Sequence, residues 1–144
     1  MTTHDNLQLM QTVDDTWNNQ DWDTYSKLYA ENVVAFSPGK PEPTRGVHDL
    51  KAEGMAFFQA FPDNHLGNRP YKVLIGQGDW TCSIARFTGT MKGPMTGPDG
   101  KQYPPTNKSF EVDFCAVVHW QNGVIVEEYF FYDLVSLMKQ IGLG

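Results

Sequence analysis

The hydrophobic period of the chain changes near Pro62, and this change restricts the available folds more than any other feature. Before it, apolar residues recur every three or four positions, as on the buried side of a helix; after it they mainly alternate with polar residues, as in a half-buried strand. Because helices that precede an antiparallel sheet cover only one of its faces, this order predicts an α+β fold with a curved sheet wrapped around the helices. A length of 144 residues predicts one domain.

The helical part divides into three segments. The first is expected over residues 5–20, the second after a cap at Asp21, and the third from Val47 until Pro62 ends it. Their apolar stripes consist of Met10, Val13 and Trp17 in the first, Trp22, Tyr25, Leu28 and Tyr29 in the second, and Leu50, Phe57, Phe58 and Phe61 in the third.

The later part predicts two antiparallel hairpins. Alternating runs over residues 71–75 and 80–84 flank the turn Gly76–Asp79, and runs over residues 110–120 and 124–132 flank an Asn-Gly pair. Asn-Gly is the strongest short hairpin signal in the chain, since both residues tolerate the positive φ of the tight turn.

Three further segments complete the expected elements. Val33–Phe36 is typical of a short strand, and Asp133 could cap a C-terminal helix. Residues 93–105 contain too many glycines and prolines for a regular element, so we expect a mobile flap there.

The composition argues against several classes of protein. Acidic residues number 17 against 11 Lys plus Arg, and the resulting net charge of −6 disfavours a partner with a phosphate backbone. The longest strongly apolar run, residues 114–118, is far shorter than the roughly 20 residues of a membrane-spanning helix. The first residues lack the basic and apolar regions of a signal peptide, so we expect a cytoplasmic protein without nucleic-acid or membrane partners.

The reactive side chains do not form a known metal or nucleophile motif. Cys82 and Cys115 each lie within an apolar, strand-like run and are expected to be ordinary buried thiols. The spacing of His, Asp and Glu matches no zinc or calcium pattern, and no Gly-rich phosphate loop or Gly-x-Ser-x-Gly elbow occurs. We therefore expect no cofactor and no metal, and proton transfer by side chains remains the available chemistry.

Short motifs spread over nearly the whole chain resemble the SnoaL-like polyketide cyclase branch of the nuclear transport factor 2-like superfamily. Their order and spacing carry the resemblance; the motifs are Trp17-Asn18, Asp21-Trp22, Leu28 to Val34, Arg45-Gly46, Phe61-Pro62-Asp63, Gly78-Asp79, Gly89-Thr90, Pro104 to Lys108, Asn122 to Glu127, Tyr132-Asp133 and Gln140-Ile141-Gly142.

The resemblance implies a cone-shaped fold, an apolar pocket between helices and sheet, and a dimer across the back of the sheet. Relatives include cyclases, dehydratases, isomerases, epoxide hydrolases and binding proteins, so the fold leaves the function open. The catalytic relatives use a carboxylate for acid–base chemistry without a cofactor. Cyclases commonly carry Glu-His-Trp-Asp where this chain has Glu127 to Phe130, and a histidine where it has Met91.

Two acidic residues are the candidate catalytic groups. Asp133 lies among apolar residues; it is either a proton shuttle in the cavity or the cap of the last helix. Glu128 takes the position of the family's histidine and could serve as acid or base, or it could be a solvated side chain. Strand alternation sends Glu127 to the opposite face, and His119 is expected to point outward as well.

Apolar and aromatic side chains could line a pocket for a flat ligand, with the hydroxyl of Tyr25 or Tyr132 orienting a carbonyl group. The expected lining residues are Trp17, Tyr25, Phe36, Phe57, Met91, Phe114, Phe130 and Tyr132. A packed core is the alternative explanation for most of them.

The sequence thus favours a small cyclase-, isomerase- or dehydratase-like enzyme that acts on a hydrophobic, carbonyl-bearing molecule. The alternative is a non-catalytic binding protein for a lipophilic small molecule. Strands such as residues 114–118 are apolar on both sides, so the outer face of the sheet is expected to pack on a second copy in a homodimer.

Overall fold

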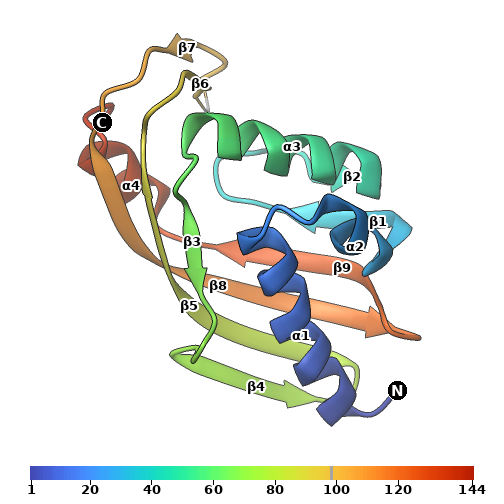
Figure 1. Cartoon of the computed structure of the whole chain (residues 1–144). Helices are drawn as coiled ribbons and strands as arrows, with labels where there is room; N and C mark the ends of the chain where they lie inside the picture. The colour runs from blue at the N-terminus through green and yellow to red at the C-terminus, as the bar shows by residue number, and fades with distance from the viewer. Residues whose placement is uncertain (98) are drawn as a thin grey trace.

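The computed structural model describes residues 1–97 and 99–144 and has the α+β architecture expected from the sequence (Figure 1). The helices are α1 (Thr3–Asn18), α2 (Trp22–Lys27), α3 (Val47–Ala60) and α4 (Leu134–Gln140). The strands are β1 (Tyr29–Phe36), β2 (Thr44–Arg45), β3 (His65–Gly67), β4 (Val73–Gln77), β5 (Trp80–Thr90), β6 (Met95–Thr96), β7 (Gln102–Tyr103), β8 (Ser109–Gln121) and β9 (Val124–Phe131).

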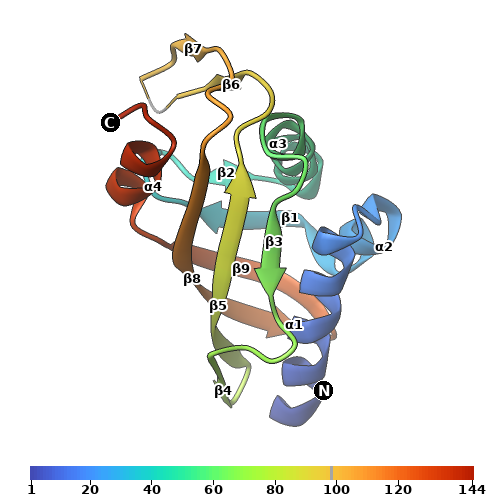
Figure 2. The ribbon, with the colours of Figure 1, turned by 60° about the vertical axis from the view of Figure 1, so that its left-hand side comes forward.

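The main sheet has the strand order β2-β1-β9-β8-β5-β3, with β4 also paired to β5. The β1–β9 pair is parallel and the others are antiparallel, so the first strand lies beside the last. The long strands β5 and β8 bend strongly, and Figure 2 shows α1, α2 and α3 together on one side of the curved sheet. This arrangement encloses an interior between the three helices and the sheet.

The β8–β9 hairpin forms around the expected turn, where Asn122 and Gly123 have φ values of 51° and 81°. Its ladder is irregular near the turn: Glu128 pairs with Val118, but Trp120 pairs with Ile125. Val126 is therefore an extra residue in β9, a β-bulge. Because of the bulge, Ile125 and Glu128 both face the interior although an odd number of positions separates them.

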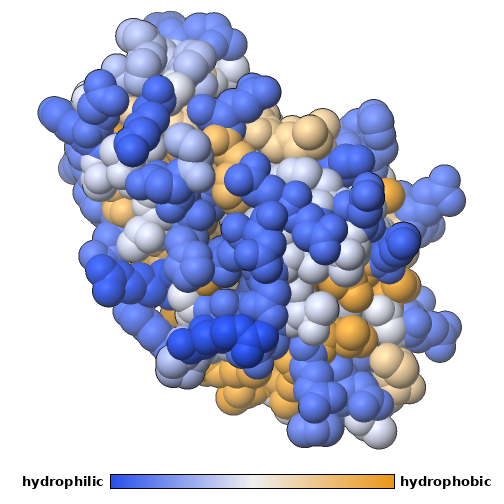
Figure 3. Space-filling model, in the orientation of Figure 1, coloured by the Kyte–Doolittle hydropathy of each residue, from blue (hydrophilic) through white to orange (hydrophobic). Residues whose placement is uncertain are grey.

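The interior contains two apolar clusters that share Trp17 and Phe114. The first lies between α1, α2 and the middle of the sheet and includes the fully buried Val118 and Ile125. The second lies toward α4 and includes the fully buried Met91. Figure 3 shows the helical side of the molecule as mainly hydrophilic with separate hydrophobic areas, so the helices cover most of this interior.

Two local expectations from the sequence are wrong. The second helix ends at Lys27, and Tyr29 starts a strand instead of continuing the helical face, because β1 gains backbone hydrogen bonds from β9, which lies far away in the sequence. The expected flap contains a regular element, since β6 and β7 pair as a two-stranded ribbon. Position 98 of that segment lies outside the described residues.

The outer face of the sheet, away from the helices, carries two neighbouring apolar rows, which we call the outer rows. The pairings place Ile75, Cys82, Val117, Tyr129 and Phe36 in one row, and Val73, Ile84, Cys115 and Phe131 in the other. Ile75 and Phe131 are 59% and 56% exposed, respectively. No helix among residues 1–97 and 99–144 is long and apolar enough to span a membrane.

Candidate functional site

Glu128 is an acidic residue in the middle of the apolar interior. Its neighbours across the ladder are Val118 on β8 and Ala35 on β1, both fully buried, and Glu128 itself is only 2% exposed. The Tyr29 hydroxyl donates a hydrogen bond to Oε2 of Glu128 over 3.5 Å. Within the described part of the chain, no donor reaches Oε1. A buried carboxyl oxygen without a partner is costly, so this atom requires an explanation.

Burial changes the protonation of Glu128. Loss of solvation raises the pKa of its carboxyl group to about 8, and the negative charge of Asp14 contributes in the same direction, whereas the hydrogen bond from Tyr29 opposes the rise. The carboxyl group therefore exchanges its proton near neutral pH.

Two neighbouring tyrosines, whose rings are tilted by 43° to each other, lie close to this carboxyl group. Tyr25 on α2 and Tyr29 on β1 are buried, with ring centroids 4.8 Å apart. Burial, and secondly the charge of Glu128, raises the pKa of both hydroxyls. Both tyrosines consequently remain protonated at neutral pH and can donate hydrogen bonds.

A second carboxylate with altered acidity comes from α1. Asp14 Oδ2 accepts a hydrogen bond of 2.6 Å from the hydroxyl of Tyr71, and burial raises the pKa of Asp14 to about 7. Asp14, Tyr29 and Tyr71 are not among the site residues predicted from the sequence. The sequence does contain a sign that Asp14 is buried. It lies four residues after Met10 and three before Trp17, which places an acidic side chain on the apolar stripe of the helix.

Asp133 lies outside this interior. It is exposed, and Oδ1 accepts a hydrogen bond of 2.9 Å from the backbone N–H of Ser136, so it caps α4. The expectation that Asp133 projects into an apolar cavity is wrong, because the strand ends at Phe131 and the chain turns into the helix at this residue. The expected cap at Asp133 is confirmed.

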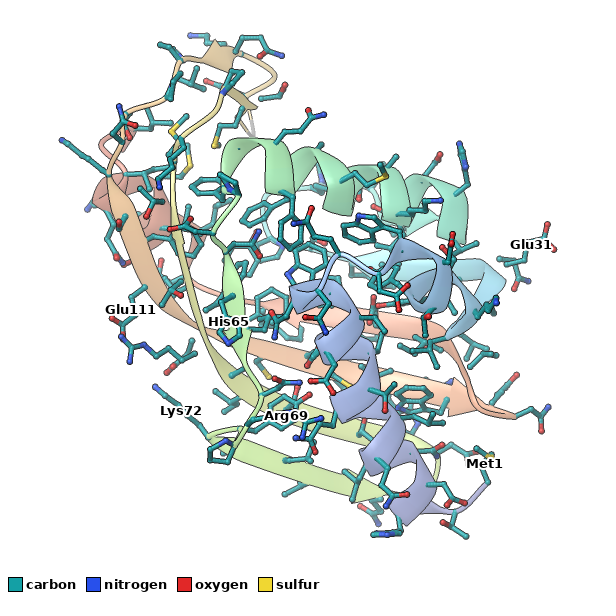
Figure 4. All side chains as sticks on the ribbon, viewed as in Figure 1. Met1, Glu31, His65, Arg69, Lys72 and Glu111 are labelled. Atoms are coloured by element: carbon teal, nitrogen blue, oxygen red, sulfur yellow. The ribbon has the colours of Figure 1, made fainter. Side chains whose placement is uncertain are left out.

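Most of the expected lining residues lie in the interior. Phe114 contacts Phe130 and Tyr132, with ring centroids 5.2 and 5.5 Å apart, and all three rings are partly buried. The remaining interior members are Trp17, Tyr25 and Phe57, which pack together, and Met91, which belongs to the second cluster. In Figure 4, side chains fill the space between α1, α3 and the sheet, while the labelled Glu111 points away from it.

Phe36 is the exception among the predicted lining residues. It lies on the outer face of the sheet, 36% exposed, and stacks on Tyr129 with ring centroids 4.7 Å apart. The parallel register between β1 and β9 turns Ala35 inward and Phe36 outward. The outward positions expected for Glu127 and His119 are confirmed, since their side chains pair on the outer face at 3.8 Å.

Two hollows open at the edges of the molecule. One of about 380 Å³ lies at the end of the sheet, and one of about 170 Å³ lies beside the N-terminus of α1. The larger hollow contains the exposed carboxylates of Asp63 and Glu111, and Glu111 is paired with Arg86. The interior around Glu128 remains the stronger candidate site, because its carboxyl group is buried and one of its oxygens has no partner among the residues that the structure describes.

No group of three or more His, Cys, Asp or Glu side chains in the described residues is arranged to hold a metal ion. The chemistry that the site can support with its own groups is proton transfer by Glu128, with hydrogen bonds from Tyr25 and Tyr29.

Comparison with solved structures supports the fold. A candidate SnoaL-like polyketide cyclase from Jannaschia sp. CCS1 superposes with a TM-score of 0.86 at 20% identity, covering 99% of this chain and 95% of that chain. The candidate polyketide cyclase IdmH from Streptomyces antibioticus gives 0.77 at 22% identity, with 94% and 96% covered. AclR from Streptomyces galilaeus, described as a candidate hydroxylase, gives 0.80 at 18% identity, with 98% of both chains covered.

A comparison with curated proteins found no match. The family model for the SnoaL-like polyketide cyclases matches residues 7–141, which include Glu128 and every strand of the main sheet. The chain therefore belongs to the SnoaL-like polyketide cyclase family.

Proposed function

We propose that this protein is a cyclase-like enzyme that moves protons on a hydrophobic, carbonyl-bearing substrate, with Glu128 as the catalytic acid and base. The observation that carries the proposal is the carboxyl group itself, which is 2% exposed and has an oxygen without a donor within the described chain. A substrate group that donates to Oε1 would remove the cost of that unpaired atom.

The acidity of Glu128 suits this role. A carboxyl group with a pKa of about 8 is mostly protonated at pH 7, yet about a tenth of the molecules carry the base. Proton transfer is most efficient when the pKa of the catalytic group lies near the working pH. An ordinary exposed glutamate would be a much weaker base.

The proposed reaction starts with loss of a proton from a carbon next to a substrate carbonyl. Glu128 takes that proton, and a tyrosine hydroxyl, from Tyr25 or Tyr29, donates a hydrogen bond to the enolate oxygen that forms. The enolate carbon then attacks a second carbonyl of the same molecule, and Glu128 returns its proton to the new alkoxide. Return of the proton to another carbon would give an isomerisation instead.

The substrate must reach Glu128 through the side chains that surround it. Phe114, Phe130 and Tyr132 are partly exposed aromatic rings, whereas Ala116 and Val118, which follow Phe114 on the same face of β8, are buried. We place the entry at these three rings, whose separation would admit a flat apolar molecule and whose closure would exclude water.

Phe130 favours a second candidate function. Where many relatives have an acid, this chain has an apolar ring in the interior, which would also suit a protein that binds a lipophilic molecule without chemistry. Native mass spectrometry of the purified protein would reveal a retained ligand. Incubation of that ligand with fresh protein would show whether it is converted. Conversion would show that the protein does more than bind the ligand.

We also propose that two copies of the chain pair through the outer rows. Exposed Ile75 and Phe131 lie in neighbouring rows of one sheet face, which together form a continuous apolar surface. An isologous dimer would bury this surface on both chains.

The decisive experiment compares two neighbouring glutamates on opposite faces. A panel of aromatic and aliphatic β-diketones is screened for conversion, and the best substrate is then tested with Glu128→Gln and Glu127→Gln. We expect Glu128→Gln to lose at least about 100-fold in kcat, in keeping with removal of a general acid–base group, while Glu127→Gln retains activity. Equal activity of the wild type and Glu128→Gln would exclude Glu128 as the catalytic group.

A further inference from the structure

The two cysteines of the chain converge on the outer face of the sheet. Cys82 on β5 and Cys115 on β8 are 33 positions apart in sequence, but their Sγ atoms lie 4.0 Å from each other. Both are partly buried, and both are free thiols. The sequence predicted two ordinary buried thiols, whereas the fold brings them together as a pair.

The strand register makes this pair unsuitable for a disulfide. Cys82 lies opposite Val117 and Cys115 lies opposite Ile84, so the cysteines are diagonal neighbours across the ladder. Diagonal positions are about 7–8 Å apart, with a somewhat smaller Cβ separation, whereas a disulfide requires Cβ atoms about 3.5–4.5 Å apart. Closing an S–S bond of about 2 Å would therefore require displacement of the central strands.

The same spacing fits a metal ion placed between the sulfurs. A zinc–thiolate bond is about 2.3 Å long, so two bonds of this length span up to about 4.6 Å, which exceeds the 4.0 Å between the two sulfurs. One ion can therefore contact both sulfurs. The two thiols are thus spaced for a shared ion without movement of the backbone.

The surroundings of the pair determine which ion would fit. Ile75 lies beside Cys82, Phe131 lies beside Cys115, and the described residues bring no third His, Cys, Asp or Glu ligand to the pair. Two sulfur ligands in an apolar setting suit a soft ion that accepts low coordination numbers, such as Cu(I), better than Zn²⁺, which takes four ligands.

We propose that Cys82 and Cys115 form a two-thiolate site for Cu(I). On binding, two S–H bonds break, two S–Cu bonds form, and two protons leave to solvent; no electron is transferred, because the ion arrives as Cu(I). Metal ions bind the thiolate form of cysteine, so the arriving ion displaces the thiol protons. The site is independent of the acid–base chemistry at Glu128, which lies on the opposite face of the sheet.

The test titrates the reduced, intact protein with Cu(I) held by bicinchoninate under argon. We expect the wild type to remove one Cu(I) per chain from the coloured complex, and X-ray absorption to show sulfur as the nearest ligand. Loss of a residue that only hydrogen-bonds to a metal ligand typically lowers the affinity by roughly 10- to 100-fold. Because each cysteine is itself a proposed ligand, Cys82→Ser and Cys115→Ser should each lower the affinity for Cu(I) by more than that. Ile84→Val, which changes an outer-face residue opposite Cys115 and leaves both sulfurs, should bind as the wild type does.

Urea unfolding of each variant checks that the fold persists. The proposal is overturned if either serine variant binds Cu(I) as tightly as the wild type, since the ion would then lie elsewhere. It is also overturned if a glutathione buffer at a reducing potential converts the pair to an intramolecular disulfide, because the thiols would then be a redox pair.

Discussion

The hydroxyl of Tyr29 lies 3.5 Å from Oε2 of Glu128, although 99 positions separate the two residues in sequence. The parallel pairing of β1 with β9 brings them together, and the hydrogen bond favours the charged form of the carboxyl group. In Tyr29→Phe, we expect the pKa of Glu128 to rise further above its ordinary value. Carbon-13 NMR titration of labelled glutamate carboxyls measures this shift, and a fall in the pKa would contradict the assigned contact.

Glu128→Gln should change how stability depends on pH. The carboxyl group has a pKa of about 8 in the folded protein against 4.5 for an ordinary glutamate, so the folded state binds the proton more strongly. This contribution to stability is fully present below pH 4.5 and is lost as pH rises through about 8. Urea unfolding measures this difference. Within that window, the free energy of unfolding of the wild type should fall by up to about 1.4 kcal/mol per pH unit more than that of Glu128→Gln.

Asp14→Asn should lower the pKa of Glu128, because the charge of Asp14 raises it. Because Glu128 must be deprotonated to act as a base, the acidic limb of the pH–activity profile should then move to lower pH, a readout that a purely structural defect would not produce. Asp15→Asn is the matched control, since Asp15 is paired with Arg69 and does not affect the acidity of Glu128. An unchanged profile in Asp14→Asn would exclude coupling between the two carboxylates.

Asp133→Ala should weaken the protein without impairing catalysis. The loss of a helix N-cap costs about 1 kcal/mol, which urea unfolding can resolve. Asp133→Asn keeps an oxygen for the N–H of Ser136 and should lose much less stability. If both variants lost activity while remaining folded, Asp133 would have to act on the substrate.

Phe131→Lys should dissociate the proposed dimer. The side chain is 56% exposed on the outer face, and a charge there would have to be buried when two copies pair. Sedimentation velocity gives the mass in solution. Met55→Lys is a control of similar exposure on α3, away from the outer rows, and should leave the mass unchanged. A wild type that sediments as a monomer would refute the pairing.

The elements that depend on nearby residues could be predicted from the sequence. The helix beginning at Val47 and the Asn122-Gly123 hairpin are examples, since each depends on side chains within a few positions. Alternation also separates Glu127 from Glu128 correctly. These features follow from local periodicity and turn chemistry.

The site depends on contacts that no local pattern contains. Tyr29 had the spacing of a helix stripe, and its place in β1 is fixed by hydrogen bonds to β9. Asp14 becomes a site residue because Tyr71, which lies 57 positions later, donates to it. For Asp133, the sequence allowed both a cavity position and a cap, and only the path of the chain after Phe131 decided between them.

The extra residue in β9 makes the position of the acid insensitive to one residue of chain length. Because the bulge at Val126 takes up the extra residue, its removal would give a regular ladder in which Glu127 still lies opposite His119 and Glu128 opposite Val118. Each glutamate would keep its face of the sheet. A shortening by a single codon at the bulge would thus leave the acid in the interior.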